Sequence, residues 1–214
     1  MSEEVSRYLG RREDLRFLTG HGRFTADLVP DDTLHAVFVR SAIARGHIRQ
    51  IEVEAARAAP NIVAVLTADD TARDNISNMV WTGSPVRDDG LTGVESQRPL
   101  LSGSVIRHLG EPICMIVGRT RQSAMDAAEL INISYEAEQE VALTLGELKG
   151  PLVWPESPDN IASLHVLGDK VAVEAAIDVS AHQVHLDFDI SKVAACPIEM
   201  RSALGTLDEM EGCV

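Results

Sequence analysis

The sequence predicts an α+β protein, in which short strands and short helices follow one another along a chain of 214 residues. Three observations lead to this prediction. Short segments rich in Val and Ile recur along the chain, as expected of strands. Between them lie Ala-rich segments whose apolar residues repeat every three or four positions, as on one face of a helix. A chain of this length also removes about 70% of its unfolded surface from water, so it can bury a core.

The first elements are expected after an N-terminal arm of about thirty residues that is rich in Gly and Arg. Residues 34–40 (LHAVFVR) alternate and predict a strand, and residues 48–53 predict a second strand. Residues 54–59 are Ala-rich and predict a short helix that ends at Pro60, because proline cannot continue a helix. The β-branched run at residues 62–67 (IVAVLT) is short enough for a buried strand.

Residues 69–99 are rich in Asp, Asn, Ser, Gly and Pro, and no regular element is predicted for them. A loop of this length is uncommon in a compact domain, so we expect it to be either functional or mobile. Because none of its residues has the spacing of ligands, the favoured expectation is a flexible surface excursion.

A strand, a helix and a further strand are expected next. Residues 112–118 (PICMIVG) form an apolar run, and Thr120 has the position of a helix N-cap. Residues 131–135 then alternate as a strand does. The predicted helix carries one apolar face, formed by Ala124, Ala127, Ala128 and Ile131.

The C-terminal third begins with a candidate linker. Thr144 and Glu147 have capping-box spacing, which predicts a short helix just before it. Residues 150–160 contain three prolines and a glycine, which favours a linker. Residues 171–176 predict a helix, and residues 184–190 predict a strand with alternating apolar and polar side chains.

Composition restricts the partners of the chain. Nineteen Lys and Arg against 33 Asp and Glu give a net charge of −14, which argues against nucleic acid and anionic membranes as partners. No apolar run is long enough to span a bilayer, and the acidic N-terminus lacks the basic start of a signal peptide. Cys114, Cys196 and Cys213 are too widely spaced for a disulfide framework or a thiolate cluster, and Cys114 is expected to be buried. We therefore expect a soluble cytoplasmic protein.

Local motifs identify no catalytic residue. On a strand, His182 and His185 would point to opposite faces and could not share a metal ion. Two carboxyl groups have suggestive settings: Glu111 lies at the start of an apolar strand, and Glu199 lies two residues before Arg201. The simplest interpretation of Glu199 and Arg201 is a surface ion pair on one strand face.

Taken in order, the segments resemble the start of the large, molybdenum-binding subunit of the xanthine dehydrogenase and aldehyde oxidase family. The carbon monoxide dehydrogenase branch is the nearest. The most specific pieces are residues 34–41 (LHAVFVRS) and residues 109–112 (LGEP) with the strand and Ala-rich helix that follow. The resemblance covers nearly the whole chain, apart from the excursion at residues 70–97.

The resemblance implies an α/β hammerhead domain at residues 1–149. It also implies a linker and the N-terminal stub of a molybdopterin-binding domain at residues 150–214. Family subunits are several times longer, and their cofactor contacts and glutamate base lie beyond the point equivalent to Val214. Residues 198–201 (IEMR) resemble the family's Met-Glu-Pro-Arg without its proline, so Glu199 is the one candidate substrate-binding residue.

The implied function is that of one part of a molybdenum hydroxylase. The complete enzyme would hydroxylate a carbon centre or oxidise carbon monoxide, with molybdopterin in the full subunit and FAD and 2Fe–2S clusters on partner chains. This chain alone is expected to hold no cofactor, metal or catalytic residue. The alternative is a stand-alone scaffold or binding protein, or a remnant, with the hammerhead fold. The final segments are expected either to be disordered beyond about Leu167 or to pair in a homodimer over residues 182–207.

Overall fold

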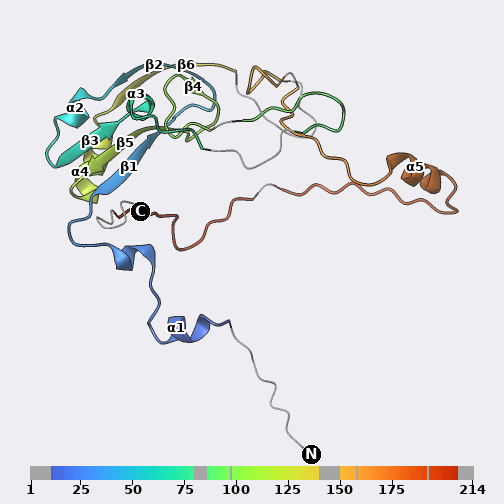
Figure 1. Cartoon of the computed structure of the whole chain (residues 1–214), viewed down its shortest axis with the longest axis horizontal. Coiled ribbons are helices and arrows are strands. Elements are labelled where there is room, and N and C mark those ends of the chain that lie inside the picture. Colours follow the sequence, from blue (N-terminus) through green and yellow to red (C-terminus); the bar gives the residue numbers. More distant parts are fainter. Residues whose placement is uncertain are drawn as a thin grey trace, which may run out of the picture. The chain divides into compact units, whose positions relative to one another are not determined.

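The computed structural model describes residues 11–79, 86–96, 98–139, 150–157, 159–191 and 193–206. The chain divides into two units, one of residues 34–185 and one of residues 1–33 with 186–214. The smaller unit contains helix α1 (Asp14–Leu18) and the 3-10 helix η1 (Thr25–Leu28), both in the N-terminal arm. The larger unit contains both sheets (Figure 1).

The first sheet contains β1 (His35–Arg40), β5 (Pro112–Gly118) and β3 (Ile62–Leu66), in the order β1-β5-β3. Both pairings with the central strand β5 are antiparallel. All three strands were expected from their apolar runs, and these predictions are confirmed. The central strand is apolar along its whole length because neighbours on both sides and the core behind it exclude water from most of its residues.

The second sheet contains β4 (Val105–Ile106), β2 (Gly46–Glu52) and β6 (Asn132–Ala137), also antiparallel, in the order β4-β2-β6. Gly46 begins β2 with a φ of 149°, a backbone conformation that favours glycine. A Cβ atom at this position would collide with the carbonyl oxygen of Glu136 on β6. The close approach of β2 and β6 therefore depends on a residue without a side chain.

Four short helices complete the larger unit: α2 (Glu54–Arg57), α3 (Ala68–Arg73), α4 (Arg121–Ala128) and α5 (Lys170–Asp178). Thr120 caps α4 as predicted, because its hydroxyl oxygen accepts a hydrogen bond of 3.1 Å from the backbone N–H of Ser123. The helix expected at residues 171–176 is confirmed by α5. Helix α3 was not predicted, and it lies inside the segment interpreted as a loop.

The core of the larger unit forms where both sheets meet helices α2 and α4. Ile113, Cys114 and Ile116 from β5 are completely buried, as are Ala124 and Ala127 from α4. The small alanine side chains allow α4 to lie close against β1 and β5. The prediction that Cys114 is a buried apolar residue is confirmed.

The strand predicted at residues 184–190 does not form. The side chains that were expected to face a core remain exposed, from 68% for Leu186 to 88% for Ile190. An alternating pattern specifies which side chains share a face, but a strand also needs a partner for its backbone N–H and C=O groups. Within the described residues, no strand pairs with this segment. The helix expected from Thr144 and Glu147 lies outside the described residues.

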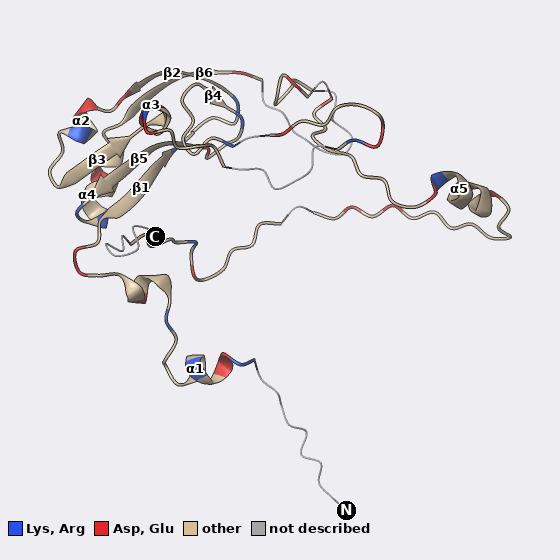
Figure 2. Ribbon diagram, in the orientation of Figure 1, with Lys and Arg blue, Asp and Glu red and all other residues tan. Residues whose placement is uncertain are grey.

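No helix in the part of the chain described here has the length and apolar character needed to cross a membrane. Lys and Arg residues are interspersed with Asp and Glu along the chain (Figure 2).

Candidate functional site

The buried carboxylate of Glu111 lies just before β5, where the chain turns into the central strand. Only 3% of this residue is exposed. The hydroxyl of Ser102 donates to Glu111 Oε1 at 2.5 Å, and the backbone N–H of Arg107 donates to Oε2 at 2.7 Å. Both oxygens are therefore occupied in holding the loop that precedes β5. The arrangement gives Glu111 a structural role, which the sequence alone left open.

The backbone around Glu111 is held by the end of β1. The N–H of Ser41 donates to the carbonyl oxygen of Glu111 at 2.8 Å, and the N–H of Gly110 donates to the carbonyl oxygen of Ser41 at 3.0 Å. Gly110 has a φ of 78°, which a glycine adopts at little cost. The Leu-Gly-Glu-Pro segment is thus a tight turn fixed from both sides.

Arg87 forms a second network, which joins two segments far apart in the sequence. Its guanidinium group donates two hydrogen bonds to Asp159, each of 2.7 Å, and two more to Asp89, of 2.5 and 3.1 Å. It also donates to the carbonyl oxygen of Ile161 at 3.0 Å. Arg87 itself is 7% exposed. A planar guanidinium that binds carboxylates in pairs fixes their positions as well as their charges.

Backbone hydrogen bonds continue this junction. The N–H of Asp88 donates to the carbonyl oxygen of Leu164, and the N–H of Leu164 donates to that of Val86, both at 3.0 Å. The favoured expectation of a flexible surface excursion over residues 69–99 is therefore wrong for residues 86–89, which pair with residues 159–164. The candidate linker at residues 150–160 likewise ends in an ordered contact. We name this arrangement, formed by Arg87, Asp89 and Asp159, the Arg87 clamp.

The Arg87 clamp should contribute less to the stability of the fold in strong acid. Hydrogen bonding to Arg87 is the largest cause that lowers the pKa of Asp159, to about 2, and the same cause lowers the pKa of Asp89. An unfolded Asp titrates near about 3.9. The stability that the Asp159 carboxylate contributes is therefore complete above about pH 4, and it is lost as the pH falls through about 2.

Carbon-detected NMR titration of the side-chain carboxyl of Asp159 would measure this directly. We expect a midpoint near 2 in the natural chain and an ordinary Asp midpoint in an Arg87→Met variant. An ordinary midpoint in the natural chain would show that the clamp does not form in solution.

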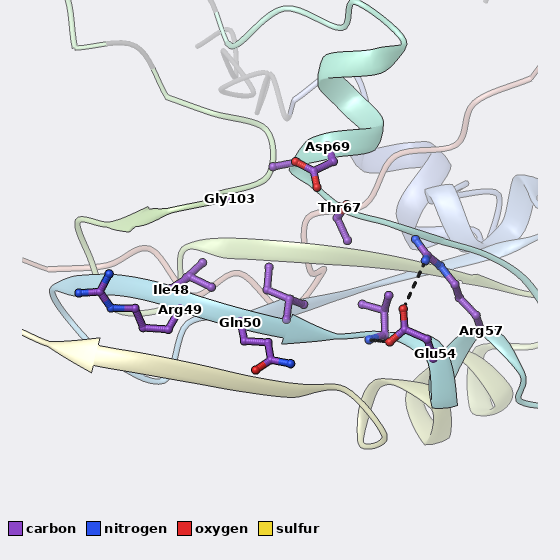
Figure 3. Close-up of a pocket in the computed structure, with 11 residues that line it drawn as sticks. Ile48, Arg49, Gln50, Glu54, Arg57, Thr67, Asp69 and Gly103 are labelled. Atoms are coloured by element: carbon purple, nitrogen blue, oxygen red, sulfur yellow. Dashed lines mark hydrogen bonds and ion pairs between the residues drawn. The ribbon is translucent and has the colours of Figure 1, made fainter.

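A pocket of about 330 Å³ lies between β2, α2 and the start of α3 (Figure 3). Two of its charged groups, Glu54 and Arg57, are paired with each other at 3.9 Å, and Arg57 lies 3.8 Å from Asp70. The hydrogen bond from the backbone N–H of Thr67 is the largest of the effects that keep the pKa of Asp70 below its usual range. The polar lining residues labelled in Figure 3 are Arg49, Gln50, Glu54, Arg57, Thr67 and Asp69.

Several of these polar groups are already engaged in hydrogen bonds or ion pairs. The hydroxyl of Thr67 donates to the carboxylate of Asp70, which also accepts from the backbone N–H of Thr67 at the start of α3. The described lining residues include neither His nor Cys. Cys114 lies in the core, where burial raises the pKa of its thiol to about 11 and keeps it protonated at neutral pH.

Glu199 lies in a bend and is exposed, as is Arg201. The ion pairs among the described residues do not include the expected contact between them. Within the same residues, no three His, Cys, Asp or Glu side chains gather as metal ligands would. The structure thus brings Glu199 together with no other candidate site residue. Its substrate-binding role stays a prediction.

Comparisons with known proteins place the chain in a family. Residues 19–139 match the model described as aldehyde oxidase and xanthine dehydrogenase, a/b hammerhead domain. The nicotine 6-hydroxylase large subunit of Paenarthrobacter nicotinovorans is 30% identical over 97% of this chain and 25% of its own length. The xanthine dehydrogenase molybdenum-binding subunit of Escherichia coli O157:H7 is 27% identical over 90% of this chain and 25% of its own length.

The fold agrees with these matches. The crystal structure of a Cu,Mo-CO dehydrogenase superposes with a TM-score of 0.63 at 25% identity, over 81% of this chain and 22% of that chain. This chain therefore spans about a quarter of the length of the curated relatives it matches, and it corresponds to the N-terminal portion of such large subunits. The predicted resemblance is confirmed: the chain belongs to the aldehyde oxidase and xanthine dehydrogenase family, and residues 19–139 carry its a/b hammerhead domain.

Proposed function

We propose that this chain is the N-terminal part of the large subunit of a molybdenum hydroxylase and that it works only within the assembled enzyme. The observation that supports the proposal best is the hammerhead match over residues 19–139, together with the coverage of only a quarter of each large-subunit relative. In this proposal residues 1–149 form the hammerhead domain, and residues 150–214 begin the molybdopterin-binding domain. The assembled enzyme would be cytoplasmic.

The residues described here do not fit a molybdenum cofactor by themselves. No group of three His, Cys, Asp or Glu side chains lies together among them, and the carboxylates of Glu111, Asp89 and Asp159 are engaged in internal hydrogen bonds. The remaining length of the large subunit would hold the molybdopterin. When bound, that group supplies the oxidation of a carbon centre or of carbon monoxide with water as the oxygen source. FAD and 2Fe–2S clusters on companion chains would receive the electrons.

In this assembly the hammerhead unit would orient the rest of the subunit. Its own core and the turn held by Glu111 would give it a fixed shape, and the Arg87 clamp would tie it to the segment that follows. The exposed apolar side chains of residues 184–190 would be covered by that polypeptide, because exposed apolar patches of this kind commonly mark interaction surfaces.

Co-expression tests this proposal. The chain would be produced alone, and together with the reading frame that follows its gene and supplies the remaining length of the subunit. We expect a stable complex that contains molybdenum and reduces an electron-accepting dye, whereas the chain alone should do neither. A chain that is stable alone and forms no complex would instead favour the stand-alone scaffold or binding protein.

Glu199 is proposed to contact the substrate in the assembled enzyme. A Glu199→Gln variant should lower kcat/KM about tenfold or more, because a hydrogen bond to a charged group contributes about 1.5–3 kcal/mol. Its molybdenum content should be unchanged. Glu174→Gln on α5, where the carboxylate is also exposed, is the matched control and should leave kcat/KM unaltered. Equal kinetics for the two variants would refute the role of Glu199.

A further inference from the structure

Arg107 follows β4 and lies flat against the indole ring of Trp154. The guanidinium carbon is 4.0 Å from the ring centroid, which is close enough for a cation–π interaction. Trp154 belongs to residues 150–157, which come much later in the chain. The contact therefore joins the hammerhead match to the segment that follows it.

The guanidinium group of Arg107 has no polar partner among the described residues. Its Nε atom is buried and has no hydrogen-bond acceptor, and the ion pairs of these residues do not include it. Buried donors in folded proteins are nearly always paired.

A second buried atom without a hydrogen-bond partner belongs to Ser157, three residues after Trp154. The Oγ of Ser157 has no hydrogen-bond partner in the described part of the chain, and the backbone N–H of Ser157 donates to the carbonyl oxygen of Trp154 at 2.9 Å. Among the described residues, both buried side-chain atoms that lack partners thus belong to residues in contact with Trp154.

A pocket of about 250 Å³ opens beside the stacked pair. This volume is below the range of about 300–1,000 Å³ that is typical of small-molecule sites, and it suits a single side chain. Arg and Trp are also the residues that most often anchor protein–protein interfaces. The walls of this pocket include Asn78, Pro99, Ser104 and Val105 in addition to Arg107 and Trp154.

The pocket is held in shape by Glu111. The backbone N–H of Arg107 donates to one oxygen of Glu111, and Ser102, which also lines the pocket, donates to the other. Because both oxygens are occupied, Glu111 fixes the position of Arg107 without forming an ion pair with its guanidinium group. A preformed site of this kind binds its ligand with little cost of ordering.

We propose that the Arg107–Trp154 pocket anchors the carboxylate of an Asp or Glu side chain from another polypeptide of the assembled enzyme. The guanidinium would donate to both carboxylate oxygens, in the geometry that arginine favours. The indole would cover the other face of the guanidinium. This inference rests on the proposed function, because it assigns one contact by which the chain joins its complex.

The first test uses the chain alone, with acetate as the carboxylate probe and chloride at equal ionic strength as the control. NMR would follow the Nε–H of Arg107 and the indole N–H of Trp154. We expect both signals to shift in a saturable way with acetate and not with chloride, and the Trp154 shift to disappear in an Arg107→Gln variant. Equal shifts with the two salts would overturn the proposal.

The second test measures the affinity of the chain for the co-expressed remaining part of the subunit. Arg107→Gln should weaken binding at least about tenfold, and Arg107→Lys should weaken it less, because lysine keeps the charge but lacks the planar donor pair. Arg49→Gln is the control, since Arg49 is exposed and already pairs with Glu136. Unchanged thermal unfolding of all variants would show that they remain folded.

The outcomes separate the two proposals. Unaltered affinity in Arg107→Gln would overturn the anchoring role, even if acetate binds. A dimer of the chain that requires Arg107 would also overturn it, because the carboxylate would then come from a second copy. If the natural chain does not bind the remaining part of the subunit, the proposed function fails, while the acetate titration still decides whether the pocket accepts a carboxylate.

Discussion

Replacing Glu111 with methionine should lower the free energy of unfolding by about 2–5 kcal/mol. The substitution keeps a side chain of similar length but leaves the hydroxyl of Ser102 and the backbone N–H of Arg107 without an acceptor. Each buried donor left unpaired costs about 1–3 kcal/mol. Urea unfolding followed by circular dichroism would measure the loss, with an unchanged slope if only stability is affected.

A graded series makes this result specific to the two hydrogen bonds. Glu111→Gln retains one acceptor oxygen and should lose about half as much stability as Glu111→Met. Glu129→Met changes an exposed carboxylate at the end of α4 and should alter the free energy of unfolding by no more than about 0.5 kcal/mol. Equal stabilities of Glu111→Met and the natural chain would mean that Glu111 does not hold the loop.

Replacing Ile116 with alanine should destabilise the larger unit by about 2–5 kcal/mol, the range measured for truncation of large buried side chains to alanine. Ile116 is completely buried at the centre of β5, between Val37 of β1 and Val65 of β3. No neighbour can fill the space without breaking the register of the sheet, so the lost contacts leave a cavity. The measurement is again the free energy of unfolding in urea.

The size of the truncation should set the size of the loss. Ile116→Val removes one methylene group and should cost about 0.5–1.5 kcal/mol. Val63→Ala removes more carbon but lies on β3 with 49% of the residue exposed, so it should cost less than Ile116→Ala. A larger loss for Val63→Ala than for Ile116→Ala would place the core elsewhere.

The strands of the first sheet could be predicted because their signal is local. Residues 34–40, 62–67 and 112–118 each carry a compact run of β-branched or apolar side chains, and the structure places a strand in each. Helix α4 was also predictable, since Thr120 satisfies a free backbone N–H within its own first turn. These features depend on neighbours a few residues away.

The start of helix α3 has a capping pattern in the sequence that predicts a helix. Thr67 and Asp70 stand three residues apart, as in a capping box, and the carboxylate of Asp70 accepts hydrogen bonds from the backbone N–H and the hydroxyl of Thr67. The surrounding Asp residues favoured a loop interpretation. The capping pattern is the better indicator here, because the structure begins a helix directly after Thr67.

Other features were beyond sequence reasoning because their partners are distant. Arg87 and Asp159 are 72 residues apart, and nothing local indicates that they meet. The apolar alternation at residues 184–190 predicts a strand, but it cannot supply the neighbouring strand, and the segment stays exposed. The position of Glu111 before an apolar strand drew attention to it, whereas its hydrogen bond from Ser102 required the fold.

Gly46 has a consequence for the evolution of the gene. Any substitution at this residue adds a Cβ that meets the carbonyl oxygen of Glu136 where β2 and β6 approach each other. Every amino-acid change reachable by one base substitution in a glycine codon has this effect. In a copy of the gene that drifts without selection, any missense mutation in that one codon would therefore strain the pairing of β2 with β6.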